Sequence, residues 1–245
     1  MKICVYYTCG FPDIESSSKI FEAISEYADY IEVGIPFSDP IADGPVIQFS
    51  SQKALERGFK VKQAFPIIKK LSEKFPEKKF LIMTYYNIIF KDADEFLRKS
   101  KESGVWGLVI PDLPPGEDSE FENKVEKLDI KKVFFVSPTT PKKRIKIISK
   151  RTSGFIYYIT VKGVTGERDE LPEDIIKNIK VVRGFTNKEI LAGFGISKAE
   201  QIKMFKNVAD GVIIGSAIIR KVIESGDLNT AINRIKKFLE EAKSV

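Results

Sequence analysis

The chain has 245 residues, of which 43% are hydrophobic, so it can bury one sizeable core or two smaller ones. Its 40 Lys and Arg residues outnumber 34 Asp and Glu residues, but they are scattered over helix-like stretches, which indicates solvated helix faces rather than a nucleic-acid surface. The absence of histidine excludes Ser-His-Asp triads, histidine bases and His-ligated metals, which leaves acid–base work to carboxylates, tyrosines or lysines.

Short apolar runs alternate along the chain with amphipathic stretches of helical period. The expected strands are Ile3–Thr8, Asp29–Val33, Phe80–Thr84, Gly107–Ile110, Val133–Ser137, Phe155–Thr160, Glu189–Ala192 and Gly211–Ile214. The expected helices are Ser17–Glu26, Lys62–Lys74, Phe96–Ser103, Glu120–Leu128, Arg144–Ser149, Asp174–Lys180, Ala199–Phe205 and Leu228–Ala242.

This alternation predicts an α/β fold with a parallel sheet, and several of the strands are apolar on both faces, as buried parallel strands are. Eight such units in a chain of this length favour a single (β/α)8 TIM barrel, one domain that spans residues 1–245. An open doubly wound sheet is the alternative, but no glycine-rich dinucleotide fingerprint follows the first strand.

Cys4 and Cys9 lie on or beside the first expected strand, which is too straight to join them as a disulfide. We expect both to be reduced and buried, as in a cytoplasmic protein. The N-terminus does not resemble a signal peptide, and no apolar run approaches membrane-spanning length. The expected location is therefore cytoplasmic, without membrane contact.

The junction after the second expected strand carries an acidic side chain where barrel enzymes have their active sites. If Ile31 and Val33 face the helices, strand alternation points Glu32 into the barrel interior. Burial there would raise the pKa of Glu32 toward the range useful for proton transfer. A buried Lys or Arg could neutralise it instead, but none lies inside an expected strand, so Glu32 is the candidate acid–base residue.

A second acidic residue, Asp43, follows in a loop that Pro36 and Pro40 stiffen. An aspartate before a glycine such as Gly44 is often a turn or cap residue. The spacing alone leaves that interpretation and a catalytic one equally open.

The run from Ile31 to Gly44, IEVGIPFSDPIADG, resembles the signature of the tryptophan synthase α subunit family. Six further segments match that family, each after another expected strand: Thr8–Asp13, Tyr85–Asn87, Pro111–Pro114, Gly163–Gly166, Gly193–Ser197 and Gly215–Ile218. The resemblance therefore extends over essentially the whole chain.

This resemblance implies a carbon–carbon lyase that cleaves indole-3-glycerol phosphate, by a retro-aldol reaction, into indole and glyceraldehyde 3-phosphate. It assigns acid–base chemistry to Glu32 and binding of the indole N–H to Asp43. It also implies that Tyr157 lines the site and that Thr165 closes over it and contacts the aspartate. It implies no metal and no cofactor in this chain.

Phosphate binding needs backbone N–H groups, which glycines and a helix N-terminus supply. The candidate phosphate-binding residues are Gly195, Gly215, Ser216 and, by resemblance, Gly166. For Gly193 and Gly211, tight packing at strand ends is the expectation instead. The resemblance also implies a flat apolar indole pocket lined by Tyr6, Met83, Val109, Val136, Tyr157 and Phe194, although each of these is equally plausible as ordinary core.

The family works as an α2β2 complex whose β subunit carries pyridoxal phosphate and consumes the indole. The resemblance implies that the Pro36–Asp39 loop and the Lys162–Pro172 segment meet that partner. We expect Lys162–Pro172 to act as a mobile lid, with an ordinary surface loop as the alternative. The first expected strand starts at Ile3, without the preceding helix that family members often carry, so the bottom of the barrel should be covered differently.

Three other functions are alternatives to this one. A different phosphate-binding barrel, an isomerase or synthase, would not carry the Glu32 and Asp43 pair. A non-catalytic subunit that only activates a β partner should lack one of these carboxylates. A stand-alone indole-releasing lyase differs only in having no β partner, which the sequence does not reveal.

Overall fold

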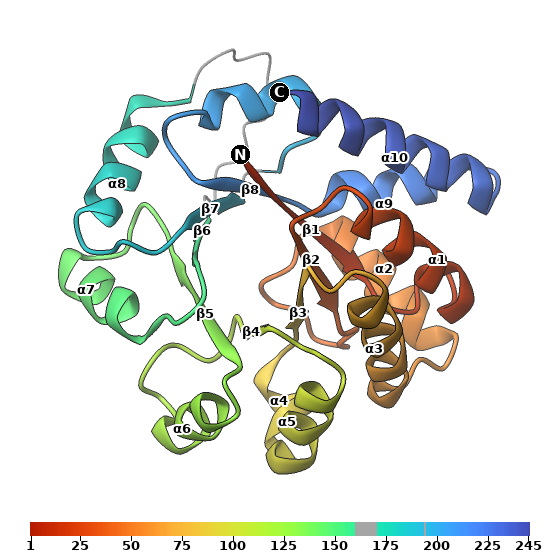
Figure 1. Ribbon diagram of the computed structural model, residues 1–245, viewed down its shortest axis with the longest axis horizontal. Helices are drawn as coiled ribbons and strands as arrows, with labels where there is room; N and C mark the ends of the chain where they lie inside the picture. The colour runs from red at the N-terminus through yellow and green to blue at the C-terminus, as the bar shows by residue number, and fades with distance from the viewer. Residues whose placement is uncertain (160–170, 194) are drawn as a thin grey trace.

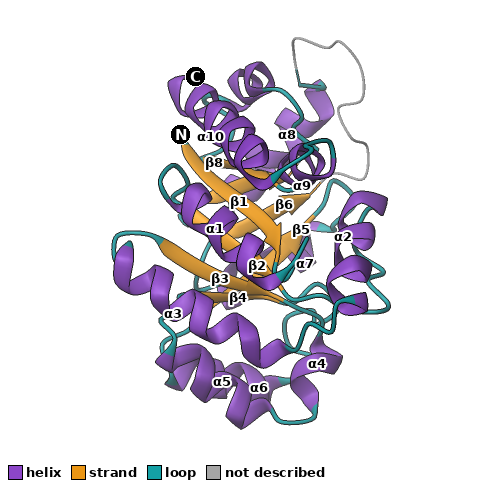
Figure 2. Cartoon of the chain, turned by 90° about the vertical axis from the view of Figure 1, so that its right-hand side faces the viewer, coloured by secondary structure: helices purple, strands orange, loops and turns teal. Residues whose placement is uncertain are grey.

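Eight parallel strands close into a barrel in a computed structural model that describes residues 1–159, 171–193 and 195–245 (Figure 1). Each strand pairs with the next in chain order, and β1 pairs with β8 to complete the ring. Seen from the side, the strands lie between helices on both flanks (Figure 2). The predicted (β/α)8 TIM barrel is therefore confirmed.

All eight expected strands are present, with ends that differ from the expectation by at most two residues. The strands are β1 Lys2–Thr8, β2 Tyr30–Gly34, β3 Lys79–Met83, β4 Gly107–Val109, β5 Lys131–Val136, β6 Ile156–Ile159, β7 Ile190–Gly193 and β8 Gly211–Ile214. The helices are α1 Ile14–Ser25, α2 Pro45–Glu56, α3 Ala64–Lys74, α4 Tyr86–Phe90, α5 Ala93–Glu102, α6 Ser119–Lys127, α7 Lys142–Arg151, α8 Glu173–Arg183, α9 Ser216–Ile223 and α10 Leu228–Ser244. Two 3-10 helices, η1 Val61–Gln63 and η2 Ala199–Phe205, complete the described elements.

Helix α2 was not expected from the sequence, because its buried face is small and polar. Its fully buried residues are Ser50, Ser51 and Ala54, which leave no apolar stripe of helical period. The segment Ala199–Phe205 is helical as expected but adopts the 3-10 form.

Strand alternation separates two cores. Ile31 and Val33 pack in the outer core between the strands and the helices, as expected. Their neighbours on the same strand, Tyr30 and Glu32, are also buried, and Tyr30 belongs to a second cluster with inward-facing residues of the other strands. The expected orientation of Glu32 toward the barrel interior follows from this alternation.

Aromatic side chains fill the barrel at its N-terminal end, where the strands begin. The Tyr30 ring lies edge-on to the rings of Trp106 and Phe155, with centroids 5.5 and 5.1 Å away. The ammonium group of Lys79 lies 4.9 and 4.8 Å from the ring centroids of Tyr30 and Trp106. The Tyr30 hydroxyl donates a hydrogen bond to Glu189, so this end is packed rather than open.

Both cysteines are free and buried, as expected from their spacing. Cys4 packs in the inner cluster and Cys9 in the outer one. In the described ranges of the chain, no helix is both long and apolar enough to cross a membrane.

Gly211 is required by the close approach of β8 to β1. A Cβ atom there would lie 2.6 Å from the backbone oxygen of Lys2, its partner in the strand register. We expect Gly211→Ala to lower the free energy of unfolding by about 2 kcal/mol, because the two strands must separate to admit the methyl group. Urea unfolding measures this change. Gly226→Ala is the matched control, since a Cβ atom at Gly226 meets nothing within 4 Å; equal losses in both variants would contradict the packing argument.

Candidate active site

A cavity of about 480 Å³ opens at the C-terminal ends of the strands. Its wall combines strand ends with the loops that follow them, and its residues include Tyr6, Asp43, Met83, Phe135, Tyr157 and Gly215. This is the end of a barrel at which parallel strands deliver functional side chains. The wall is mixed, since apolar side chains of the strands and glycines both line it.

Glu32 is fully buried, and among the described residues neither of its carboxyl oxygens has a hydrogen-bond partner. On β2 it lies beside Tyr6 of β1 and Leu81 of β3 in the strand register. Burial raises the pKa of Glu32 to about 8, and the nearby charge of Asp43 adds to the rise. At neutral pH this carboxyl group is therefore mostly protonated, as a proton donor must be.

A buried lysine that could neutralise Glu32 is present in a strand, but it forms ion pairs with other residues. No Lys or Arg lies inside the expected strands, but β5 begins two residues earlier than expected, at Lys131, and so includes Lys132. The Lys132 ammonium group is buried, but it pairs with Glu122 of α6 at 3.2 Å and with Glu126. Strand alternation thus directs this lysine to the helices and leaves the barrel interior without its charge.

Asp43 lies in the loop after β2 and is fixed by hydrogen bonds to its backbone and side chain. Its N–H donates to the Pro40 carbonyl at 3.0 Å, and its own carbonyl accepts from Gln48 at 2.8 Å. Burial raises the pKa of Asp43 to about 6, although a hydrogen bond from Tyr85 opposes the rise. The N-cap of α2 is Gly44, without a side-chain cap bond, so Asp43 is not a helix cap.

The two carboxyl groups therefore differ in charge over the same pH range. Between about 6 and 8, Asp43 is ionised while Glu32 remains protonated. Two neighbouring acids with separated pKa values are the arrangement by which enzymes assign one group to proton transfer and the other to charge stabilisation.

Tyr6 lines the cavity, and its ring requires Gly34 on the adjacent strand. A Cβ atom on Gly34 would lie 2.3 Å from the Tyr6 hydroxyl oxygen. That hydroxyl is 3.4 Å from the side-chain oxygen of Thr8, which is 2.6 Å from that of Ser50 on α2. This buried chain of hydroxyl groups ties the ring and the strand end to the unexpected helix.

The apolar part of the wall agrees with the sequence at Met83 and Tyr157 but not at Val136. Val136 packs in the outer core, and its neighbour Phe135 faces the cavity, with its ring centroid 4.7 Å from that of Tyr157. The prediction for Val136 was wrong because one residue along a strand reverses the face. Val109 packs in the inner cluster but does not line the cavity.

Glycines line the cavity near β7 and β8. Gly195 has a φ of +63° with open space where a Cβ atom would lie, so a side chain would be strained there for backbone reasons alone. Gly215 is the N-cap of α9 and makes no side-chain cap bond, and both it and Ser216 line the cavity. The N-terminus of α9 therefore opens toward the cavity, a setting that favours an anion.

Gly193 and Gly211 are explained by packing, as expected. A Cβ atom on Gly193 would lie 3.0 Å from the Tyr157 ring, and Gly211 approaches the β1 backbone. Four further expectations fall outside the described residues: Thr165, Gly166, Phe194 and all but the last two residues of the Lys162–Pro172 segment.

Tyr85 is the site residue that the sequence did not single out. It lies immediately before α4, and its hydroxyl group donates to Asp43 at 3.0 Å. The only signal in the sequence was its membership of the segment Tyr85–Asn87 at the end of the third expected strand. Tyrosines at strand ends often pack in the core, so the direction of the Tyr85 side chain could not be inferred from the sequence.

The comparisons with known proteins agree with one another. The family model described as tryptophan synthase alpha chain matches residues 2–245. The tryptophan synthase alpha chain of Methanocaldococcus jannaschii is 44% identical over 234 residues, which cover 95% of this chain and 83% of that relative. The chain belongs to the tryptophan synthase alpha chain family. This family is a family of lyases in tryptophan biosynthesis.

Other members of the tryptophan synthase alpha chain family extend the match to structure. The alpha chain of Pyrococcus abyssi is 42% identical, covering 91% of this chain and 90% of its own length. A solved tryptophan synthase alpha-subunit of Pyrococcus furiosus superposes with a TM-score of 0.90 at 37% identity, covering all of this chain and 98% of that one. A structure of the tryptophan synthase complex of Pyrococcus furiosus gives a TM-score of 0.89 at 36% identity, with the same coverage.

The buried Glu32 should make the stability of this family member depend on pH. Below the ordinary value of 4.5, folded and unfolded chains both hold the proton. Between 4.5 and about 8 only the folded chain keeps it, so the free energy of unfolding falls as the pH rises. Because Gln cannot ionise, the free energy of unfolding of Glu32→Gln lacks this dependence. We expect the difference between the variant and wild type to change by about 3 kcal/mol in favour of the variant from pH 5 to pH 8.

Urea unfolding of both proteins at several pH values tests this expectation. The exposed Glu117→Gln variant is the matched control, because it makes the same chemical change at the surface. An advantage of Glu32→Gln that is constant with pH, or that appears equally in Glu117→Gln, would contradict the role of burial.

Proposed function

We propose that this chain is an indole-3-glycerol-phosphate aldolase, which releases indole and glyceraldehyde 3-phosphate. The observation that carries the proposal is the fully buried, unpaired Glu32, which lies next to Tyr6 in the strand register, and Tyr6 lines the same cavity as Asp43. Membership of the tryptophan synthase alpha chain family supports it. The apolar strand residues suit an indole ring, and the glycine-lined part suits a phosphate.

The proposed reaction begins with the protonated Glu32, which delivers its proton to C3 of the indole. The ionised Asp43 accepts a hydrogen bond from the indole N–H and stabilises the positive charge that develops on the ring. The Glu32 carboxylate then removes the proton of the C3′ hydroxyl group while the C3–C3′ bond breaks. Indole leaves with the bond electrons, the aldehyde forms at C3′, and Glu32 is protonated again.

The remaining roles in this proposal concern binding. Tyr157 and Tyr6 line the indole pocket together with Phe194, and Thr165 closes over the bound substrate. The phosphate is bound by backbone groups of Gly195, Gly215, Ser216 and Gly166. Support for the phosphate assignment comes from the uncapped N-terminus of α9 beside the cavity.

The site discriminates against one of two rival functions. A subunit that only activates a partner has no use for a buried carboxyl group without a counter-ion, which destabilises the fold at neutral pH. A stand-alone indole-releasing lyase would use the same residues, so the two carboxyl groups do not discriminate against it. The presence of a β partner separates the two cases.

We expect wild-type protein to release indole from indole-3-glycerol phosphate with a bell-shaped dependence of kcat on pH. Activity should require ionised Asp43 and protonated Glu32, so it falls below about pH 6 and above about pH 8. Glu32→Gln and Asp43→Asn should each lower kcat by about 100-fold or more, because each removes a group used in the transition state. Glu117→Gln is the surface control.

Absorbance or fluorescence of released indole measures these rates. Full activity in Glu32→Gln would refute its acid–base role, and an inactive wild-type protein, also after addition of a β subunit, would refute the aldolase itself. Stimulation of wild type by β would support the heteromeric enzyme over the stand-alone lyase.

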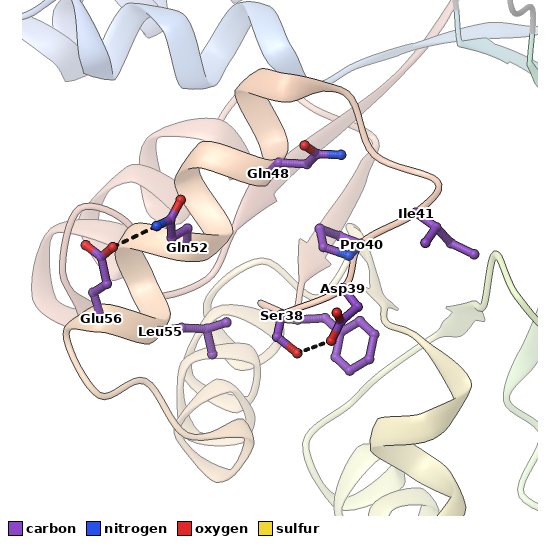
Figure 3. A pocket seen from close by; sticks show the side chains of 9 residues that line it. Ser38, Asp39, Pro40, Ile41, Gln48, Gln52, Leu55 and Glu56 are labelled. Carbon is purple, nitrogen blue, oxygen red and sulfur yellow. Dashed lines mark hydrogen bonds between the residues drawn. The ribbon is translucent and has the colours of Figure 1, made fainter.

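We propose in addition that the chain binds a pyridoxal-phosphate-dependent β subunit in an α2β2 complex. A groove of about 580 Å³ supports the location, since it lies between the loop Phe37–Ile41 and helix α2. Figure 3 shows Gln48 and Leu55 on the side of α2 toward this loop, whereas Gln52 and Glu56 are hydrogen-bonded to each other. Ile41 points away from α2 and is 84% exposed, so its apolar side chain is available for contact with a partner. The Lys162–Pro172 segment is proposed as the second contact and as the lid.

Ile41→Asp should weaken binding of a β subunit by about 10-fold, because it replaces a central apolar contact with a charge. Isothermal titration calorimetry with a β subunit from a related organism measures the affinity. Ile147→Asp is the control, since Ile147 on α7 is also an exposed large apolar residue. Unchanged affinity in Ile41→Asp, or equal losses in both variants, would count against this surface.

A further inference from the structure

The Tyr85 hydroxyl group lies between a backbone N–H and a carboxyl group of the loop that follows β2. It accepts a hydrogen bond from the N–H of Ala42 at 3.0 Å and donates one to Oδ2 of Asp43, also at 3.0 Å. Because the N–H of Ala42 can only donate, the phenolic proton must point to Asp43. Burial also raises the pKa of the Tyr85 phenol well above its ordinary value, so the proton stays on Tyr85.

The ring that carries this hydroxyl group is held on several sides. It stacks on Phe37, with centroids 5.0 Å apart and an interplanar angle of 25°, and only 3% of Tyr85 is exposed. Its backbone is the N-cap of α4, and the next residue, Tyr86, donates its N–H to Asp112 at 2.8 Å. The hydroxyl position is therefore fixed by packing before any substrate arrives.

Three acidic side chains, Glu32, Tyr6 and Tyr157, interact electrostatically with Asp43, and a fourth, Asp112, acts on its partner Tyr85. None of these can supply a positive charge. In the ranges that the structure describes, Tyr85 is the side chain that donates a hydrogen bond to this carboxyl group. Its hydroxyl group therefore both orients the carboxylate and offsets the charge around it.

We propose that Tyr85 is a positioning residue of the reaction: its hydroxyl group holds one oxygen of Asp43 so that the other faces the indole N–H. This inference rests on the proposed function, which assigns that role to Asp43. Tyr85 itself does not touch the reacting atoms. It acts on the reaction indirectly, by fixing the side-chain conformation of Asp43 and by stabilising its negative charge.

Tyr85→Phe tests the proposal, because it removes the hydroxyl group and keeps the ring on Phe37. We expect kcat to fall by about 10-fold, since a hydrogen bond to a charged group is lost. The acid limb of the kcat profile, which reports ionisation of Asp43, should move to higher pH, because the hydrogen bond that lowers the Asp43 pKa is gone. The basic limb should stay in place.

Tyr86→Phe is the matched control. Its hydroxyl group also donates to a carboxyl group, that of Asp118, but on the side of α6, away from the cavity lining. It should retain the kcat and both limbs of the wild-type profile. A loss that Tyr86→Phe shares would mean that any lost tyrosine–aspartate bond slows the enzyme, which overturns the specific role of Tyr85.

A measurement without substrate separates this inference from the proposed function. Carbon-13 NMR of protein labelled at the aspartate carboxyl groups, with the Asp43 signal identified by its absence in Asp43→Asn, gives the Asp43 pKa directly. A higher value in Tyr85→Phe than in wild type supports the proposal, and an unchanged value overturns it. If wild type does not cleave indole-3-glycerol phosphate, the proposed function fails, and the titration still decides whether Tyr85 holds Asp43. If cleavage is normal and Tyr85→Phe retains the wild-type kcat, only the positioning role fails.

Discussion

The closed barrel confines every second side chain of each strand to a narrow interior. Glu32 occupies one of these positions without a counter-ion or a hydrogen-bond partner among the described residues. That confinement explains why the pKa of Glu32 is high and why it differs from the pKa of Asp43. The chemistry proposed for the pair depends on this difference. The apolar packing around it is what the site requires, although it is unfavourable for the ionised group.

Much of this could be predicted from the sequence, because the strands are strongly apolar and a period of two fixes the face of each residue. The inward direction of Glu32 could be inferred because its neighbours Ile31 and Val33 are apolar and pack on the opposite face of the strand. The same rule failed at Val136, because the residues before it, Phe134 and Phe135, are apolar on both faces of the strand. Helix α2 was missed because it is buried through serine and alanine.

Contacts between loops that are distant in the chain could not be predicted from the sequence. Tyr85 and Asp43 are far apart in the chain, and their hydrogen bond depends on the course of two loops across the top of adjacent strands. Turn residues such as Pro40 indicate that a loop is stiff, but not where it points. The resemblance named the segment that contains Tyr85 without giving the direction of its hydroxyl group, so the structure was needed to join the two residues.

Gly34 shows how such packing restricts the way this site can evolve. No side chain fits at this position while the Tyr6 ring is present, since a Cβ atom would fall on the ring. Conversely, a smaller residue in place of Tyr6 would leave a void that only a larger residue at position 34 fills. Relatives in which one of the two differs should therefore differ at both, and the pair should appear as correlated changes in an alignment of the family.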